Sequence, residues 1–517
     1  MRRRLLLGLL ILALAVTVPT GAGLVRRASV SSPDAAPAVA VPAADCAGLP
    51  LAAARELRGM WITTVNNIDW PSRKGLPEAA VKAEYLGWLD LAVKRRHNAV
   101  FVHVRPSGDA LWPSRYAPWS EWLTGVRGRD PGWDPMAWMV AETHRRGIEF
   151  HAWFNPYRGS QPATVGGAGA DLARLAPDHP LRERPDWAVA HPPGARDARL
   201  YFDPGIPEAR RFVEDSILEA VRLYDVDGVH FDDFFYPYPS GADFPDGRSY
   251  AEYGGGVPRA AWRRANVDTF VREMRERLAA LKPWVRFGIS PFGIWRNAAT
   301  DPAGSATRGL QSYDAIYADT RRWVREGWLD YIAPQLYWHI GFAKADYAKL
   351  LPWWASVVAG TGVLLYIGQA DYRVGEEGAW SRPAELDRQL ALNDRYGVSG
   401  SIHFSAKQVR ADRLGAVSRY AEAHYAAPAL VPTATRLRGV GPGAPRVTAG
   451  GDALTWPPVP SAAGYAVYRA GSAGAAELVA TVPEPRWAGP AGTYCVTALD
   501  RVANEGGASP AATLAAG

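Results

Sequence analysis

Cysteine is almost absent from this chain of 517 residues, which contains only Cys46 and Cys495. Two thiols cannot form a cysteine-ligated metal site, so that class of zinc or iron–sulfur protein is excluded. They allow at most one disulfide, which would join the two ends of the chain. The spacing does not decide between that bond and two unpaired thiols.

Clusters of basic residues are also missing. The formal charge is +6, from 58 basic and 52 acidic residues, and three of the arginines lie at positions 2–4. Without those three, the chain has 55 basic and 52 acidic residues, and its surface is expected to be nearly neutral. Strong binding to nucleic acid through phosphate contacts is therefore not expected.

Several short motifs that identify other enzyme classes are absent. No glycine-rich phosphate-binding fingerprint follows the first predicted strand, which argues against a dinucleotide-binding fold. No Gly-x-Ser-x-Gly elbow follows a strand, which disfavours a serine nucleophile. No close His-x-His pair occurs, so the sequence gives no strong metal signature and predicts no cofactor.

The chain begins with three arginines, the apolar run Leu5 to Val18 and small residues up to Gly23. This pattern is typical of a signal peptide, predicted over residues 1–23. The apolar run is shorter than the roughly 20 residues of a membrane-spanning helix, although an uncleaved anchor is the alternative. We therefore expect a secreted or cell-envelope protein with no stable membrane insertion after leader removal.

Composition divides the rest of the chain into four parts. Residues 24–54 are rich in Ala and Pro and are predicted to be a linker. Residues 55–426 form the main domain, and residues 427–443 are again rich in Ala, Pro and Gly. Residues 444–517 are predicted to be a small all-β domain.

In the main domain, short apolar runs alternate with amphipathic stretches, which is the pattern of βαβ units. Eight strands are expected: 57–63, 99–104, 149–154, 228–232, 286–290, 331–335, 362–367 and 400–404. Helices are expected between them, at 77–96, 135–146, 207–224, 259–281, 315–326, 347–359 and 383–396. Eight alternations favour a closed (β/α)₈ TIM barrel in the α/β class over an open doubly wound sheet.

The small domain contains four runs with the character of strands: 453–456, 464–469, 477–482 and 492–498. Turn residues separate them, as in a β-sandwich. The Trp456-Pro457 step and the tyrosines at 465 and 468 resemble a fibronectin type III module. Modules of that kind space or bind rather than catalyse.

The segment Asp227 to Pro239 is the strongest candidate for chemistry. An apolar strand ends there in Asp232 and Asp233, and an aromatic, proline-containing loop follows. Acids at the carboxyl end of a buried strand are costly unless they meet solvent, substrate or a partner, and in a barrel that end forms the active site. Alternation places His230 and Asp232 on one face of the strand. The simpler alternative is that one of the acids only caps the loop.

Other predicted strands also end in polar or aromatic residues, where a purely structural barrel would have Val, Ile and Leu. His103 and Arg105 share one face of the second strand, with Asp109 just beyond, and His151 shares a face of the third with Trp153 and Asn155. Taken singly, each histidine could be a hydrogen-bonded interior residue. Together they predict one polar and aromatic mouth.

Flat aromatic rings beside hydrogen-bonding side chains are what sugar rings require, and the chain contains 21 Trp and 22 Tyr. Cleavage of a glycosidic bond generally needs two carboxyl groups. We rank Asp232 first as a catalytic residue, with Asp233 and then Asp109 as candidates for the second. The residues expected to bind substrate are His103, Arg105, Trp153, Asn155, Tyr157, His230, Tyr236, Trp295, Gln335, Tyr337, Trp338 and His403.

Two alternatives remain open at this level. His103, His151, His230 and Asp232 could converge on a cation, as in metal-dependent hydrolases. The barrel could also bind carbohydrate without cleaving it. Whether a glycosidase of this kind retains or inverts the anomeric configuration depends on the separation of its carboxyls, which the sequence does not give.

Six segments stand out in order: Glu56 to Thr63, Val104 to Ala110, His151 to Arg158, Asp232-Asp233, Ser290 to Arg296 and Asp330 to Trp338. Together they resemble the bacterial glycosyl hydrolase-like family 10. The resemblance covers residues 55–426. It implies a TIM-barrel glycoside hydrolase that acts outside the cytoplasm on a cell-envelope or extracellular polysaccharide, with peptidoglycan glycan strands favoured.

Overall fold

The computed structural model describes residues 46–471 and 474–515. The predicted signal peptide, 1–23, and most of the predicted linker, 24–54, lie outside these residues. The domain boundaries and the signal peptide therefore stay predictions.

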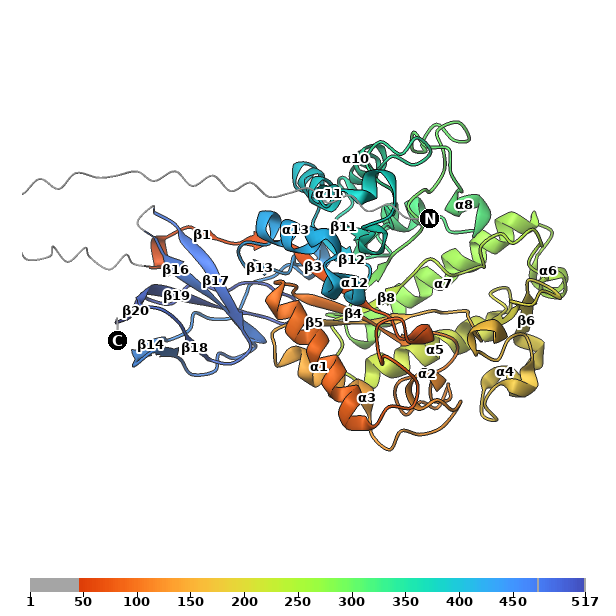
Figure 1. Cartoon of the computed structure of the whole chain (residues 1–517), viewed down its shortest axis with the longest axis horizontal. Coiled ribbons are helices and arrows are strands. Elements are labelled where there is room, and N and C mark those ends of the chain that lie inside the picture. Colours follow the sequence, from red (N-terminus) through yellow and green to blue (C-terminus); the bar gives the residue numbers. More distant parts are fainter. Residues whose placement is uncertain (1–45, 472–473, 516–517) are drawn as a thin grey trace, which may run out of the picture. The chain divides into compact units, whose positions relative to one another are not determined.

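Eight parallel strands close into a barrel in the order β10-β11-β12-β3-β4-β5-β8-β9 (Figure 1). Each predicted strand of the main domain is present, so the predicted TIM barrel is confirmed. The strands are β3 (Leu57–Ile62), β4 (Ala99–Arg105), β5 (Glu149–Phe154), β8 (Gly228–Phe231), β9 (Arg286–Ile289), β10 (Tyr331–Ile332), β11 (Leu364–Gln369) and β12 (Gly400–His403).

Helices connect successive strands, and their starts follow local chemistry. Asp134 caps α3 by accepting a hydrogen bond from the Ala137 backbone N–H, and Pro135 occupies the first turn. Asp346 caps α10 in the same way. The longer connecting helices are α1 (Glu78–Lys94), α3 (Pro135–His144), α5 (Pro207–Leu223), α7 (Arg259–Leu281), α10 (Tyr347–Val358) and α11 (Ala384–Arg395).

Shorter elements fill the loops and the end of the barrel. The short helices are α2 (Glu121–Thr124), α4 (Pro180–Glu183), α6 (Gly247–Tyr253), α8 (Ser312–Ala315), α9 (Thr320–Arg325), α12 (Ala406–Ala411) and α13 (Ala416–His424). Two strand pairs lie outside the barrel: β6 (Ala188–His191) with β7 (Arg199–Phe202), and β2 (Ala54–Arg55) with β13 (Ala429–Leu430).

Two elements differ from the prediction for local reasons. β10 ends at Ile332 rather than Gln335, because Pro334 has no N–H to give to the ladder, and Gln335 makes only isolated bridges. The helix expected over 315–326 is divided into α8 and α9. Tyr317 lies between them at φ 57°, outside the right-handed helical region, and Asp319 caps α9.

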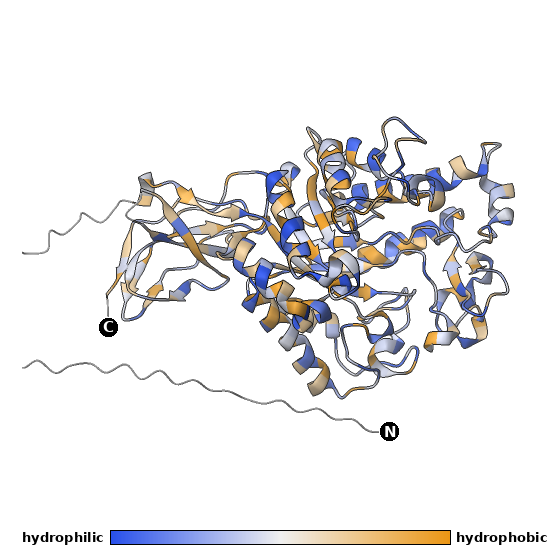
Figure 2. Ribbon diagram, turned by 45° about the horizontal axis from the view of Figure 1, so that its top comes forward, coloured by the Kyte–Doolittle hydropathy of each residue, from blue (hydrophilic) through white to orange (hydrophobic). Residues whose placement is uncertain are grey.

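Hydrophobic residues, orange in Figure 2, recur along the strands and alternate with hydrophilic blue residues along the helices. The largest core cluster joins the outer faces of the barrel strands to α1, α3, α5, α7 and α10. A second cluster inside the barrel contains Trp61, Phe101, Trp153, Tyr331 and Tyr366. The barrel interior is thus packed with aromatic rings.

The C-terminal domain contains two sheets, one of five strands in the order β1-β17-β16-β19-β20 and one of three in the order β14-β15-β18. Their strands are β1 (Leu51–Ala52), β14 (Thr448–Gly450), β15 (Ala453–Thr455), β16 (Gly464–Ala470), β17 (Ala476–Val482), β18 (Arg486–Ala488), β19 (Gly492–Leu499) and β20 (Ala512–Leu514). One core cluster includes Leu454 and Trp456 with Val467 and Tyr494, so residues of both sheets share it. The small all-β domain is confirmed, whereas its likeness to fibronectin type III stays a prediction.

The beginning of the described chain belongs to this C-terminal sheet. β1 pairs in parallel with β17 (Figure 1). Cys46 forms a disulfide with Cys495 of β19. The choice between a disulfide and two thiols is therefore decided in favour of the disulfide. Within the described part of the chain, no helix is both long and apolar enough to cross a membrane.

Candidate active site

Asp232 and Asp233 lie directly beyond the carboxyl end of β8. On a straight strand, consecutive side chains would point to opposite faces. Because β8 ends at Phe231, the chain turns and both carboxyls line the same cavity.

The cavity has a volume of about 410 Å³ and lies at the carboxyl ends of the barrel strands. Trp, Tyr and Phe are the largest group of side chains in its lining, and Asp232 and Asp233 are its only carboxyls among the residues described. The other lining residues are Trp61, Thr63, Val65, Ile68, His103, Trp153, Asn155, Arg158, Phe234, Tyr238, Ser290, Phe292, Gln335, Tyr337, Trp338 and Phe404.

Asp232 is anchored by N–H donors from β5 and from its own loop. Trp153 Nε1 donates to Asp232 Oδ2 at 3.2 Å, and the Phe234 backbone N–H donates to Oδ1 at 3.1 Å. When the Asn155 amide nitrogen faces the carboxyl, it lies 2.7 and 2.9 Å from the two oxygens. In that orientation the Asn155 oxygen accepts from His103 Nε2 at 3.2 Å.

His103 completes this side of the cavity. Its ring stacks on Trp153 with centroids 3.8 Å apart and planes 6° from parallel. Burial, followed by the charge of Arg158, holds the pKa of His103 well below its usual range, so the ring is neutral at physiological pH. The ring therefore orients Trp153 and Asn155 without adding a charge.

Asp233 faces a different group of residues. Tyr238, five residues further along the loop, donates its hydroxyl to Asp233 Oδ2. The Tyr238 ring meets Phe292 edge-on at 6.0 Å, and Phe292 meets Trp338 edge-on at 5.4 Å. One side of Asp233 is thus an aromatic wall.

Burial raises the pKa of both carboxyls, and their mutual repulsion adds to the effect at Asp232. The pKa of Asp232 rises to about 8, and the nearby Arg158 guanidinium limits the rise. The Tyr238 hydroxyl favours ionised Asp233. With a pKa of about 8, Asp232 keeps its proton at neutral pH, which is the state needed for acid catalysis.

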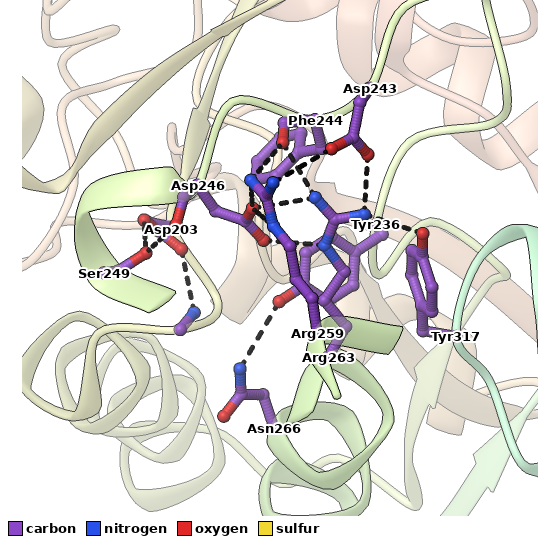
Figure 3. A network of polar contacts seen from close by, with 11 residues as sticks. Asp203, Tyr236, Asp243, Phe244, Asp246, Ser249, Arg259, Arg263, Asn266 and Tyr317 are labelled. Carbon is purple, nitrogen blue, oxygen red and sulfur yellow. Dashed lines mark hydrogen bonds and ion pairs between the residues drawn. The ribbon is translucent and has the colours of Figure 1, made fainter. Parts of the chain in front are cut away.

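The loop that carries Asp233 and Tyr238 is fixed by a polar cluster whose centre, Asp246 and Arg263, is buried (Figure 3). Asp246 accepts from Arg263 at 2.7 and 2.8 Å and from Arg259 Nε at 2.8 Å. Arg263 also donates to Asp243 and to the Tyr317 hydroxyl, each at 2.7 Å. Since both arginines belong to α7, this cluster ties the loop after β8 to the outer helix layer.

Below the cavity, polar side chains continue down the barrel. His230 accepts from Trp61 Nε1 at 3.2 Å, and the Tyr331 hydroxyl lies 3.1 Å from both His230 Nδ1 and His151 Nδ1. His151 Nε2 in turn lies 3.2 Å from Glu149. His230 and His151 are therefore interior residues that support Trp61, rather than residues of the cavity wall.

The sequence predicts that Arg105 lines the cavity together with His103. In the structure, Arg105 does not line the cavity. His103 pairs with Trp153 and Arg105 with Phe154, so β4 has one extra residue between these pairs. This bulge breaks the alternation of side chains. Arg105 is instead fully buried and donates to the backbone oxygens of Asn155 and Pro156, both at 3.0 Å.

Five further candidates also lie away from the cavity. Tyr157 packs against Phe270, Tyr236 accepts from Asn266, and Trp295 donates to Asp319. His403 bonds Asp371 at 2.9 Å and stacks on Tyr420, because it lies on the outward face of β12. Asp109 accepts from the Ser107 backbone N–H and lines a separate, small cavity.

Six predicted substrate-binding residues do line the cavity: His103, Trp153, Asn155, Gln335, Tyr337 and Trp338. Trp61, Arg158 and Tyr238 line it as well, although the sequence did not select them. Trp61 and Arg158 belong to segments of the family resemblance, and Tyr238 follows the Asp pair in the same loop, so each carried a usable signal. Phe292 also belongs to a segment of the resemblance, whereas Phe404 carried no signal beyond its position after a strand.

The residues of the metal alternative do not converge. His103 stacks on Trp153 and bonds Asn155, whereas His151 and His230 share the Tyr331 hydroxyl deeper in the barrel. Across residues 46–471 and 474–515, no group of three or more His, Cys, Asp or Glu has a metal-binding arrangement.

Comparison with known proteins agrees with this geometry. The family model described as glycosyl hydrolase-like 10 matches residues 56–383. The chain belongs to this family. It is accordingly a glycoside hydrolase, as the sequence predicted.

Two relatives illustrate the match, and one solved structure is similar at a lower level. Glycosyl hydrolase YngK of Bacillus subtilis is 45% identical over 492 residues, which cover 89% of this chain and 93% of YngK. Glycosyl hydrolase DigH of Escherichia coli is 41% identical over 367 residues, which cover 67% of this chain and 82% of DigH. The PgaB (BpsB) glycoside hydrolase domain from Bordetella bronchiseptica is 15% identical with a TM-score of 0.48, over 71% of this chain and 98% of that domain.

Proposed function

We propose that this glycoside hydrolase is exported and cleaves a cell-envelope or extracellular polysaccharide, with peptidoglycan glycan strands favoured, by acid/base chemistry at Asp232 and Asp233. The observation that carries the proposal is the meeting of two carboxyls with raised pKa values in one aromatic-lined cavity. Groups with shifted pKa values in a cleft are typical of catalytic sites.

In this proposal, Asp232 protonates the glycosidic oxygen as the bond breaks. Its pKa of about 8 keeps the carboxyl protonated at neutral pH, when an ordinary Asp would be ionised. Trp153 and Asn155 hold the carboxyl in place. The indole rings of Trp61, Trp153 and Trp338 offer faces and edges for the apolar sides of sugars, while Arg158 and Gln335 can bond the hydroxyls.

Export is supported by two independent features. The N-terminal sequence has the pattern of a signal peptide. Cys46 and Cys495 form a disulfide, a bond that persists in oxidising compartments and is rare in the cytosol. The preference for peptidoglycan follows from the family resemblance.

The proposal is tested by incubating the purified protein with separate glycans: peptide-free peptidoglycan strands, chitin oligomers, a β-glucan and an α-glucan. Products are identified by mass spectrometry and new reducing ends are counted. We expect fragments from at least one glycan, and none from the same glycan treated with Asp232→Asn. Intact polymers throughout the panel would contradict the proposed activity. Detection of the unprocessed chain only in the cytoplasmic fraction would contradict export.

A further inference from the structure

The two carboxyls of the cavity enter it from one side. Asp232 and Asp233 are consecutive, so their Cα atoms are only about 3.8 Å apart, and both follow β8. In the closed strand order, β12 is four positions from β8 in either direction and therefore lies across the barrel. Both acids thus extend from the β8 side of the cavity, and the opposite wall is formed by β12, its neighbour β3 and the segments that follow them.

That opposite wall has no carboxyl among the residues described. From β12 and β3 and the segments after them, the cavity is lined by Phe404, Trp61, Thr63, Val65 and Ile68. A sugar ring held in the cavity would thus meet acids on the β8 side and aromatic or aliphatic groups on the other side.

Carboxyls that follow the opposite strands exist, but other bonds engage them. Asp69, after β3, accepts from the Thr63 backbone N–H at 2.8 Å and from the Ser405 hydroxyl at 2.7 Å. Asp371, after β11, bonds His403 at 2.9 Å. Neither lines the cavity, so neither is placed to attack the sugar or to activate water on that side.

Hydrolysis by two enzyme carboxyls requires one on each side of the scissile bond, about 5–5.5 Å apart for retention or about 6.5–9.5 Å apart for inversion. With both acids on one side, the nucleophile has to come from elsewhere. An acetamido group on C2 of the sugar can supply it, because its carbonyl oxygen reaches C1 of the same ring.

The surroundings of Asp233 suit an acetamido group. Its carboxyl, held by the Tyr238 hydroxyl, has oxygens that can accept the amide N–H. The edge-to-face rings of Tyr238, Phe292 and Trp338 give an apolar surface for the acetyl methyl. Asp232 lies among the donors of Trp153 and Asn155, on the other side of the pair.

We propose that the nucleophile is the acetamido oxygen of a 2-acetamido sugar in the substrate itself, with Asp232 as the acid and Asp233 as the partner of the amide N–H. This inference rests on the proposed function and adds the origin of the nucleophile.

The steps balance without any further reactant. The acetamido oxygen forms a bond to C1, the C1–O glycosidic bond breaks, and Asp232 gives its proton to the leaving oxygen. Asp233 accepts the amide proton as the bicyclic oxazoline forms. Water then attacks C1 with loss of a proton to Asp232, and the oxazoline opens with return of the amide proton. The product retains the anomeric configuration.

The first experiment compares one polymer in three forms. Peptide-free peptidoglycan strands are used as isolated, after chemical de-N-acetylation, and after re-acetylation of the de-N-acetylated sample. We expect the de-N-acetylated strands to be cleaved at least about 100-fold more slowly, and re-acetylation to restore cleavage. Equal cleavage of all three would overturn this inference and leave the proposed function standing. No cleavage of any glycan would overturn the proposed function and this inference with it.

The second experiment examines the reaction course with 4-nitrophenyl β-N-acetylchitobioside as the probe. NMR during turnover is expected to show the retained anomer first, and intact-protein mass spectrometry no glycosyl ester. The thiazoline of N-acetylglucosamine, a stable copy of the oxazoline, is expected to inhibit with a Ki at least about 100-fold below KM. An inverted product or a glycosyl-enzyme adduct would overturn the inference.

The third experiment separates the two acids. Removal of the acid in Asp232→Asn should reduce cleavage of the polymer far more than cleavage of an aryl glycoside whose leaving group needs no proton. Asp233→Asn should reduce both by a similar factor, about 100-fold or more. The exposed Asp452→Asn is the matched control and should leave both rates unchanged. The opposite pattern for the two variants would overturn the assigned roles.

Discussion

Replacement of Asp232 by Asn should make the folded protein more stable at alkaline pH while it removes activity. The buried Asp232 has a pKa of about 8, against an ordinary value of 3.8. The folded state therefore binds a proton that the unfolded state has lost over this interval. Stability of the wild-type protein falls as the pH rises from about 4 to about 8, because the unfolded chain is stabilised by ionising Asp232 over this interval while the folded protein keeps the carboxyl protonated.

The size of the effect follows from the same shift. The interval between 3.8 and about 8 corresponds to roughly 6 kcal/mol of unfolding free energy, at about 1.4 kcal/mol per pH unit. An Asn does not ionise, so the variant escapes this loss. The amide nitrogen of the new Asn side chain faces the donors of Trp153 and Asn155. This contact lowers the stability of the variant by an amount that does not depend on pH. The diagnostic quantity is therefore how the difference in unfolding free energy between Asp232→Asn and wild type changes with pH.

Urea unfolding followed by tryptophan fluorescence at pH 4.5, 6, 7.5 and 9 measures this difference. We expect the stability of Asp232→Asn relative to wild type to increase by several kcal/mol between pH 4.5 and pH 9. The exposed Asp452→Asn should follow the wild-type curve throughout. Parallel curves for wild type and Asp232→Asn would refute the argument that burial and Asp233 destabilise the ionised carboxyl.

Three other predictions follow from the contacts around the site. Tyr238→Phe removes the hydroxyl that favours ionised Asp233, and kcat should fall about 10- to 100-fold with an unchanged unfolding midpoint; an unchanged kcat would contradict this role. Arg263→Met leaves the Asp246 carboxylate without its main partner, and the unfolding free energy should fall by about 3–5 kcal/mol. Asp246→Asn in the same chain should restore part of this loss, whereas additive effects of the two substitutions would argue against the pair. Cys46→Ser removes the disulfide and should destabilise the C-terminal domain by about 2–5 kcal/mol in calorimetry, with kcat/KM retained; equal melting curves would contradict a stabilising bond.

The fold could be predicted because its signals are local and repeated. Each barrel strand is a short apolar run, and each connecting helix has its own periodicity and start signal, as at Asp134-Pro135 and Asp346. The errors come from single residues that act on the backbone. Pro334 shortens β10, and the left-handed Tyr317 divides a helix that periodicity alone extends through it.

The site was predicted in outline, because acids at a strand end have few structural uses. Alternation correctly related His230 to Asp232. It failed for Arg105, since a bulge in β4 depends on pairing with β5 that one strand's sequence does not encode. It also failed for His403, whose strand has both faces buried, so that polarity does not identify the inner one.

The residues of the aromatic wall were harder to predict for a related reason. Tyr238, Phe292 and Trp338 come from three loops and meet only in the folded barrel. Tyr and Trp are as common in cores as in sugar sites, so their abundance predicted a carbohydrate-binding surface without identifying its members.

The central claim is that the Asp232–Asp233 cavity performs the hydrolysis, and turnover of one glycan by matched variants tests it most directly. On the best substrate from the glycan panel, kcat/KM of Asp232→Asn should be at least about 100-fold below that of wild type. Asp452→Asn should match wild type, and all three proteins should show the same folded circular-dichroism spectrum. Undiminished kcat/KM in a folded Asp232→Asn protein would place the chemistry elsewhere and contradict the account.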